Sequence, residues 1–135
     1  MSKPIPTIQK FMTTTPHSIG IDQTLAHAKD VLANNHIRHL PVLEGGKLVG
    51  LLSSRDVSLI ESLEGVDATK VTVEDAMSWD VYTVSPDSPL DEVAREMAEK
   101  KFGSAVVMQN QKVVGMFTTV DACRSLAELL HSRLG

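Results

Sequence analysis

Cysteine is almost absent from the sequence, since Cys123 is the only one among 135 residues. A single cysteine excludes an internal disulfide and a thiolate metal cluster within one chain. Long apolar runs are also lacking, because no stretch approaches the roughly 20 residues that a membrane-spanning helix needs. The first residues, MSKPIPTIQK, lack the apolar core of a signal peptide. We therefore expect a cytoplasmic protein with no part in a membrane.

An excess of positive charge is lacking as well. The net charge is −4 at pH 7 and the isoelectric point is about 5.7, which argues against a broad surface for nucleic acid. No cysteine or acidic cluster joins His27, His36 and His39, so we expect no metal site. The sequence shows neither a nucleophile–base–acid set nor a glycine-rich phosphate loop. It therefore predicts a binding protein, not an enzyme, with no required cofactor.

What the sequence does contain is an internal repeat. The segment GLLSSRD at 50–56 returns as GMFTTVD at 115–121, an offset of 65 residues that holds without insertion from 8–56 to 73–121. Two copies of one unit of this size indicate a duplicated supersecondary structure. Neither copy is expected to bury enough apolar surface alone, so the two should pack together.

Each copy shows the same order of expected elements. A short helical turn and an extended piece come first, then an amphipathic helix, two apolar runs joined by a tight turn, and a final helix. This order predicts an α+β fold, β-α-β-β-α twice, with the first repeat at 1–62, a linker at 63–71 and the second repeat at 72–135. The helical turns are expected at 7–12 and 72–77, the extended pieces at 18–21 and 82–85, the amphipathic helices after Asp22 and Asp87, the hairpin turns at Gly45-Gly46 and Asn110-Gln111, and the final helices at 54–62 and 119–133.

The Ser/Thr-x-x-Asp spacing at the end of each second apolar run admits two interpretations. As a helix-capping box, Ser53 would start a helix and Asp56 would bond back to it. As a ligand site, the carboxylate would accept both hydroxyls of a ribose, and the helix start would offer N–H groups to a phosphate. Arg55 lies between them, and Thr118 and Asp121 fill the same places in the second copy. We expect the first motif to serve both purposes.

The Leu-Pro-Val run, the hairpin and the Gly-apolar-apolar-Ser/Thr-x-x-Asp motif together resemble the CBS domain. Over residues 5–130 the chain is similar to a stand-alone tandem CBS pair, or Bateman module. The resemblance implies two repeats packed as a pseudo-twofold pair, with two clefts between them that bind adenosine-containing ligands. It also implies AMP, ADP or ATP as the regulatory ligand, a disc-like homodimer and a regulatory role toward an unidentified protein target.

Carried over by position, the resemblance places one cleft at Asp56 and the other at Asp121. The Asp56 cleft is expected to include Ser53, Arg55 and His39, with Thr72, Met77, Phe102 and Ser104 from the second copy. The Asp121 cleft is expected to include Thr118 and Ser104, with Thr7, Met12, Ile37 and His39 from the first copy. Ile37 and Phe102 are the expected platforms for adenine.

The two clefts are not equivalent in charge. Val120 replaces Arg55, and Gly103-Ser104 replaces Arg38-His39, so the Asp56 cleft is expected to hold a phosphorylated ligand better. Two alternatives to a nucleotide sensor stay open: an interaction or scaffold protein with empty clefts, and a binder of S-adenosylmethionine or another adenosyl ligand. The final helix carries leucines along one face, which indicates either core packing or a contact across a dimer.

Overall fold

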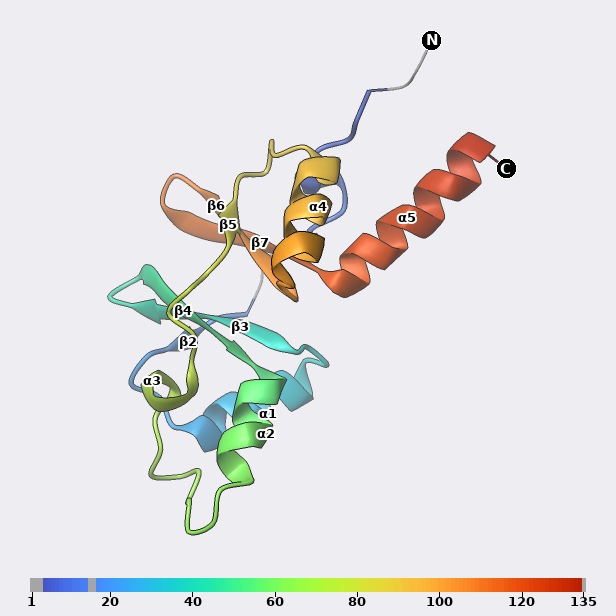
Figure 1. Ribbon diagram of the computed structural model, residues 1–135. Helices are drawn as coiled ribbons and strands as arrows, with labels where there is room; N and C mark the ends of the chain where they lie inside the picture. The colour runs from blue at the N-terminus through green and yellow to red at the C-terminus, as the bar shows by residue number, and fades with distance from the viewer. Residues whose placement is uncertain (1–3, 15–16, 135) are drawn as a thin grey trace. The chain divides into compact units, whose positions relative to one another are not determined.

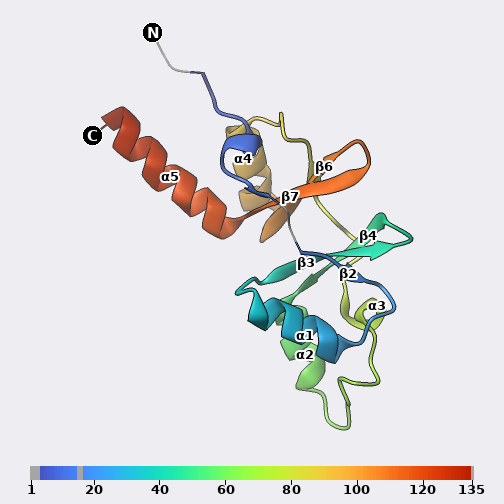
Figure 2. The same cartoon turned by 180° about the vertical axis from the view of Figure 1, so that it is seen from behind.

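The computed structural model describes residues 4–14 and 17–134. These residues form two compact units. The central unit is His17–Val81, and the terminal unit combines Met1–Pro16 with Tyr82–Gly135. Each unit has its own small sheet and its own apolar core, as two views of the ribbon show (Figures 1 and 2).

The central unit contains a three-stranded sheet in the order β2-β3-β4. Strand β2 runs parallel to β3, and β3 pairs antiparallel with β4. Helices α1 and α2 lie side by side on this unit's sheet (Figures 1 and 2). Its elements are β2 (Ile19–Gly20), α1 (Leu25–Asn34), β3 (His39–Glu44), β4 (Lys47–Ser53), α2 (Ser54–Glu61) and α3 (Val73–Ala76).

The terminal unit contains a four-stranded sheet in the order β1-β7-β6-β5. Strands β5 and β6 are parallel, while β6–β7 and β7–β1 are antiparallel. Its elements are the 3₁₀ turn η1 (Ile8–Lys10), β1 (Thr13–Thr14), β5 (Thr83–Val84), α4 (Leu90–Lys100), β6 (Ser104–Gln109), β7 (Lys112–Thr118) and α5 (Thr119–Leu134). Among the described residues, no helix is both long and apolar enough to cross a membrane.

Both hairpin turns have the backbone that the sequence predicts. Gly45 and Gly46 have φ of 58° and 82°, and Asn110 and Gln111 have φ of 54° and 65°. Positive φ at both central residues is the geometry that matches the twist of two paired strands. Glycine adopts it without steric cost and asparagine tolerates it, whereas glutamine is strained there. The second turn is therefore less favourable than the first.

The compact units do not coincide with the sequence repeats, because each unit includes a segment from the other repeat. The turn η1 packs in the terminal unit, where Ile8 is fully buried, and α3 packs in the central unit, where Val73 is fully buried. The repeats are defined by similarity of sequence, whereas the units are defined by which residues contact one another. Strand β1, which pairs with β7 at Thr13 and Thr14, has no counterpart among the expected elements.

Two equivalent glycines accommodate these exchanged segments. A Cβ atom on Gly50 would lie 2.6 Å from Met77 Sδ and 2.9 Å from Ser78 O. A Cβ atom on Gly115 would lie 2.9 Å from both Met12 Sδ and Thr13 O. Any side chain at either position would therefore push the exchanged segment away from its strand.

Candidate functional site

The β4–α2 junction of the central unit carries the capping box that the sequence predicts. Ser53 has extended backbone, with φ −109° and ψ 160°, and its Oγ accepts a hydrogen bond from Asp56 N at 3.1 Å. Asp56 Oδ2 in turn accepts from Ser53 N at 2.9 Å. Two donors at the start of α2 are satisfied by this exchange. The structural half of the interpretation is confirmed.

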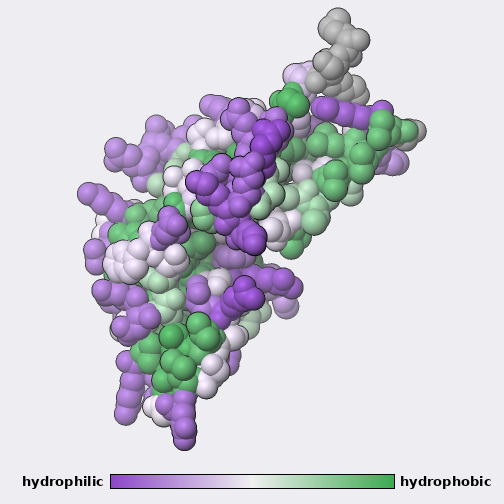
Figure 3. Space-filling model, viewed as in Figure 1, coloured by the Kyte–Doolittle hydropathy of each residue, from purple (hydrophilic) through white to green (hydrophobic). Residues whose placement is uncertain are grey.

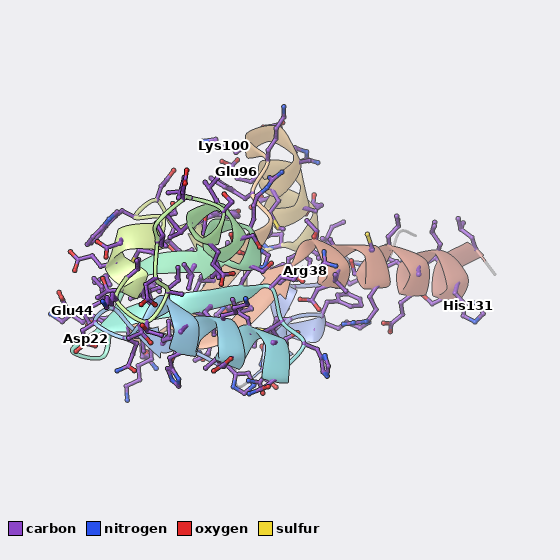
Figure 4. The ribbon with its side chains drawn as sticks, turned by 90° about the horizontal axis from the view of Figure 1, so that it is seen from below. Asp22, Arg38, Glu44, Glu96, Lys100 and His131 are labelled. Atoms are coloured by element: carbon purple, nitrogen blue, oxygen red, sulfur yellow. The ribbon has the colours of Figure 1, made fainter. Side chains whose placement is uncertain are left out.

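The same junction gathers polar groups from strand β3. His39 is the Cα partner of Ser53 in the β3–β4 ladder, and Ser54 N donates to Arg38 O at 2.8 Å. Arg38, labelled in Figure 4, and Arg55 are exposed. The central unit therefore brings one carboxylate, one hydroxyl, one imidazole and two guanidinium-bearing residues to a single strand-to-helix junction.

The His39 imidazole is half-buried and its pKa lies below the ordinary value of 6.5. Burial is the largest cause, because it disfavours the charged form. The Asp56 carboxylate raises the pKa and the Arg38 guanidinium lowers it. His39 is therefore a neutral hydrogen-bonding group near pH 7, not a cation.

Thr72 and Met77, expected near Asp56, belong to the same compact unit as Asp56. Thr72 starts α3, and both its N and its Oγ1 donate to Asp75 Oδ2 at 3.1 Å. Met77 is 8% exposed and packs in the central core, against Gly50. Ile37 is half-buried against that core.

The β7–α5 junction of the terminal unit repeats the architecture. Thr118 N donates to Asp121 Oδ2 at 2.9 Å, and Asp121 N donates to Thr118 Oγ1 at 3.4 Å. Ser104 is the Cα partner of Thr118, just as His39 is of Ser53. The Ser104 hydroxyl is buried and has no hydrogen-bond partner among the described residues. A buried hydroxyl without a partner costs free energy of folding. A polar group of a ligand that bonds to it would recover part of that cost.

The remaining expected residues of the terminal unit surround its core. Thr7 is half-buried before η1 and forms a bridge with Pro89, and Met12 packs partly buried against the core. The Phe102 ring stacks on Tyr82, with ring centroids 5.2 Å apart and planes inclined by 20°. One face of the Phe102 ring is thus already covered by a residue that sequence reasoning missed.

Two further residues missed from the sequence bond the second carboxylate. Arg124 Nη1 lies 3.0 Å from Asp121 Oδ1, and Thr13 Oγ1 donates to the same oxygen at 3.3 Å. The spacing of Arg124, three residues after Asp121 on one helix, is a signal that the sequence contains. Nothing in the sequence indicates Thr13, because its contact depends on β1 pairing with β7.

Each unit assembles part of the expected site by itself. The central unit brings together Ser53, Arg55, Asp56 and His39, and the terminal unit brings together Thr118, Asp121 and Ser104. The expected association of Phe102 and Ser104 with Asp56, and of Ile37 and His39 with Asp121, joins different units and stays a prediction. Among residues 4–14 and 17–134, no group of three or more metal-ligating side chains is close enough to hold a metal ion.

Comparison with known proteins identifies the fold. The family model of the CBS domain matches residues 1–60 and 73–128. A solved CBS domain pair in complex with 5′-methylthioadenosine and S-adenosyl-L-methionine is 28% identical, with a TM-score of 0.84, over 93% of this chain and 98% of that one. A putative acetoin utilization protein from Vibrio cholerae is also 28% identical, with a TM-score of 0.82, over 96% and 98%.

A curated relative, L-aspartate semialdehyde sulfurtransferase of Methanocaldococcus jannaschii, is 31% identical over 92% of this chain. The chain spans only 24% of the length of that enzyme. The similarity therefore concerns one region of the larger protein. With both repeats matched by the family model and the whole fold matched by solved CBS domain pairs, the chain belongs to the CBS domain family.

Proposed function

We propose that this CBS domain pair is a regulatory module that binds an adenosine nucleotide, AMP, ADP or ATP, and signals to a protein target through a change of conformation or assembly. The observation that carries the proposal is the β4–α2 junction, where the Asp56 carboxylate has an oxygen left to accept hydrogen bonds. Within the described part of the chain, its bonded oxygen is Oδ2, which accepts from Ser53 N.

The chemistry of the junction suits a ribose followed by a phosphate. Asp56 Oδ1 is able to accept from a ribose hydroxyl, and charge-assisted bonds of this kind are stronger than neutral ones. The Ser53 hydroxyl accepts from Asp56 N and keeps its own proton for donation. Arg55 and Arg38 are exposed cations beside the start of α2, where the helix dipole also favours an anion.

The similar CBS domain pair solved with adenosyl ligands supports this ligand class. S-adenosylmethionine or 5′-methylthioadenosine would use the same ribose contact without the phosphate, so they are the principal alternatives. We expect the two exposed arginines to favour a phosphorylated ligand. The sulfurtransferase chemistry of the longer relative lies outside this proposal, which is for a binding module and not an enzyme.

We also propose that the chain forms a homodimer in which another molecule of the same chain covers the apolar face of α5. Leu126, Leu130 and Leu134 are 59%, 49% and 80% exposed on that helix, which is green in the upper right of Figure 3. Beside them lies a groove of about 400 Å³ within the terminal unit. Its apolar lining includes Ile5, Pro6, Leu90, Ala94, Ala122, Leu126 and Leu129, and its charged lining residues are Asp91 and Arg133.

The exposed leucines of α5 and this groove lie on one surface. Such a surface is self-complementary under a twofold axis, because the leucines of each copy are able to enter the groove of the other. The opposite charges of Asp91 and Arg133 favour the same arrangement, since a twofold axis allows each to meet its counterpart in the other copy. This supports a homodimer in which α5 of both copies contributes.

The ligand proposal is tested by thermal unfolding with AMP, ADP, ATP, S-adenosylmethionine and adenosine. At about 100 times Kd, one site stabilises the folded state by roughly 2.7 kcal/mol, which raises the midpoint by about 5–10 °C in a chain of this size. Asp56→Ala is expected to remove most of the AMP shift and Asp121→Ala a smaller part. No shift with any ligand would favour a scaffold with empty clefts.

Both substitutions also remove a capping bond that is worth about 1 kcal/mol. Each variant's shift is therefore measured against its own ligand-free midpoint. Equal losses from Asp56→Ala and Asp121→Ala would contradict the expected difference between the two halves.

A further inference from the structure

The two equivalent aspartates differ in how fully the protein itself occupies their oxygens. Asp121 is 3% exposed and accepts four hydrogen bonds. Arg124 Nη1 and Thr13 Oγ1 donate to Oδ1 at 3.0 and 3.3 Å. Thr118 N and Thr118 Oγ1 donate to Oδ2 at 2.9 and 3.2 Å. Neither oxygen is left for a ligand unless one of these donors moves.

Among the described residues, three of these four bonds have no equivalent at Asp56, and one of the three is the hydroxyl bond, because Ser53 Oγ accepts from Asp56 N and makes no bond to the carboxylate. The residue at the place of Arg124 is Leu59, which is 63% exposed and has no polar group. The residue at the place of Thr13 is Ser78, whose hydroxyl is 3.3 Å from both Asp80 O and Asp80 N. Within residues 4–14 and 17–134, the Asp56 carboxylate therefore accepts its bond from Ser53 N alone.

The strand pairing beside the two carboxylates is equivalent, which points to the side chains as the source of the difference. Thr13 pairs with Met116 in the β1–β7 ladder, and Ser78 pairs with Leu51 in an isolated bridge at the equivalent place. No displacement of the backbone is needed to explain why both oxygens of Asp121 accept hydrogen bonds while, among the described residues, Asp56 keeps one free. Changing Arg124 alone should bring the second half toward the state of the first.

We propose that Arg124, assisted by Thr13, holds the Asp121 carboxylate against an incoming ribose and so determines that the two halves of the module bind an adenosine ligand unequally. This inference rests on the proposed function. A ribose hydroxyl reaches Asp121 Oδ1 only by displacing the guanidinium. The terminal unit therefore binds adenosine weakly, and the chain takes one nucleotide before a second.

The strength of this competition is moderate. The Arg124 side chain is 64% exposed while the Asp121 side chain is 4% exposed, so the ion pair is screened on one side only. A partly screened guanidinium–carboxylate pair is consistent with an effect of about five- to tenfold on affinity. A buried carboxylate that loses the pair also gains more from new donors.

The test is calorimetric titration of the full chain with adenosine and, separately, with AMP. Arg124→Leu puts into the second half the residue that the first half already has at position 59. The matched control is Arg95→Leu on α4, because the Arg95 side chain is 63% exposed and its partner Asp91 lies 3.9 Å away. Adenosine is the decisive probe, since it has the ribose and no phosphate that Arg124 is able to attract.

We expect the wild-type chain and Arg95→Leu to show one strong and one weak adenosine site. Arg124→Leu should tighten the weak site by about five- to tenfold and leave the strong site unchanged. Thr13→Val should act in the same direction with a smaller effect, which separates the lost bond from any repacking around Leu at 124.

The other outcomes overturn the inference in distinguishable ways. Unchanged adenosine binding in Arg124→Leu, with binding retained at the strong site, would contradict the inference alone. Weaker AMP binding with unchanged adenosine binding would make Arg124 a phosphate contact instead. No binding of adenosine or AMP to any variant, together with no thermal shift from ADP or ATP, would overturn the proposed function and the inference with it.

Discussion

His39 shows how a single side chain links the candidate site to stability. It lies opposite Ser53 in the β3–β4 ladder, and its folded-state pKa is below 6.5 because burial disfavours the imidazolium. Asp56 acts against this shift and Arg38 adds to it. The residue is therefore placed to donate or accept one hydrogen bond as a neutral ring.

This shift predicts a fall in stability on acidification. In the unfolded chain His39 takes up a proton near pH 6.5, while the folded chain resists protonation until a lower pH, so the unfolded state gains protons first. The free energy of unfolding in urea should fall as the pH drops through about 6.5, the unfolded-state pKa, and His39→Gln should flatten that part of the profile. An unchanged slope in His39→Gln would show that another group is responsible.

At the residue scale, sequence reasoning identified the two capping pairs but not the other hydrogen bonds that their carboxylates accept. The Ser/Thr-x-x-Asp spacing sufficed to predict both boxes, since a helix cap depends on residues that are neighbours in sequence. The bonds to Asp121 from Thr13 and Arg124 were missed. The first joins residues far apart in sequence, whereas the second follows from the three-residue spacing of Asp121 and Arg124 within the expected helix at 119–133, a signal that sequence reasoning overlooked.

At the scale of elements, Gly50 and Gly115 allow a segment from the other repeat to lie against β4 and β7. We expect Gly50→Ala to lower the free energy of unfolding by about 1–3 kcal/mol, because its Cβ meets Met77 Sδ and the Ser78 backbone. Gly115→Ala should have a similar cost. Urea unfolding of each variant measures the difference.

Gly20→Ala is the matched control for these two variants. Its Cβ would lie 3.1 Å from Asp22 Oδ1, the end of an exposed side chain that is free to turn away. Asp22, labelled with Glu44 in Figure 4, lies near the β3–β4 hairpin. A loss in Gly20→Ala as large as in Gly50→Ala would mean that glycine is needed there for another reason.

Helix α5 is twice as long as its equivalent α2, with 16 residues against 8. We expect Leu126→Glu combined with Leu130→Glu to convert a dimer into a monomer, because two charges would enter the apolar face. His131→Glu, near the C-terminal end of the same helix (Figure 4), is the control and should stay dimeric. Light scattering with size-exclusion chromatography measures the mass, and a wild-type monomer would refute the dimer.

The elements themselves were largely predictable from the sequence. Tight turns, caps and amphipathic helices depend on local residue order, so α1, α2, α4 and both hairpins were expected within a few residues of their observed bounds. Strand β1 was not, because Thr13 and Thr14 form a strand only through their partner β7. Isolated two-residue pairings have no sequence pattern of their own.

At the scale of the whole molecule, the exchange of segments makes a distinctive prediction. Ile8→Ala should destabilise the terminal unit and Val73→Ala the central unit, although each residue belongs to the other sequence repeat. Deleting a buried side chain of this size from a core costs about 2–4 kcal/mol. Amide hydrogen exchange should therefore accelerate in β6 and β7 for Ile8→Ala, and in α1 and β3 for Val73→Ala.

The opposite pattern, with Ile8→Ala affecting α1 and β3, would contradict the division into compact units. Leu59→Ala serves as the control in both measurements. Its side chain is 63% exposed, so its removal should leave exchange in both cores unchanged.

The exchange of segments also fixes an order of events during synthesis. The central unit is continuous in sequence, so all of its residues have been synthesised once Val81 is added. Strand β1 has to stay unpaired until β7 emerges, because Thr13 pairs with Met116. The terminal unit is thus begun first and completed last, and a nascent chain stalled before β7 would carry an unpaired β1 together with a complete central unit.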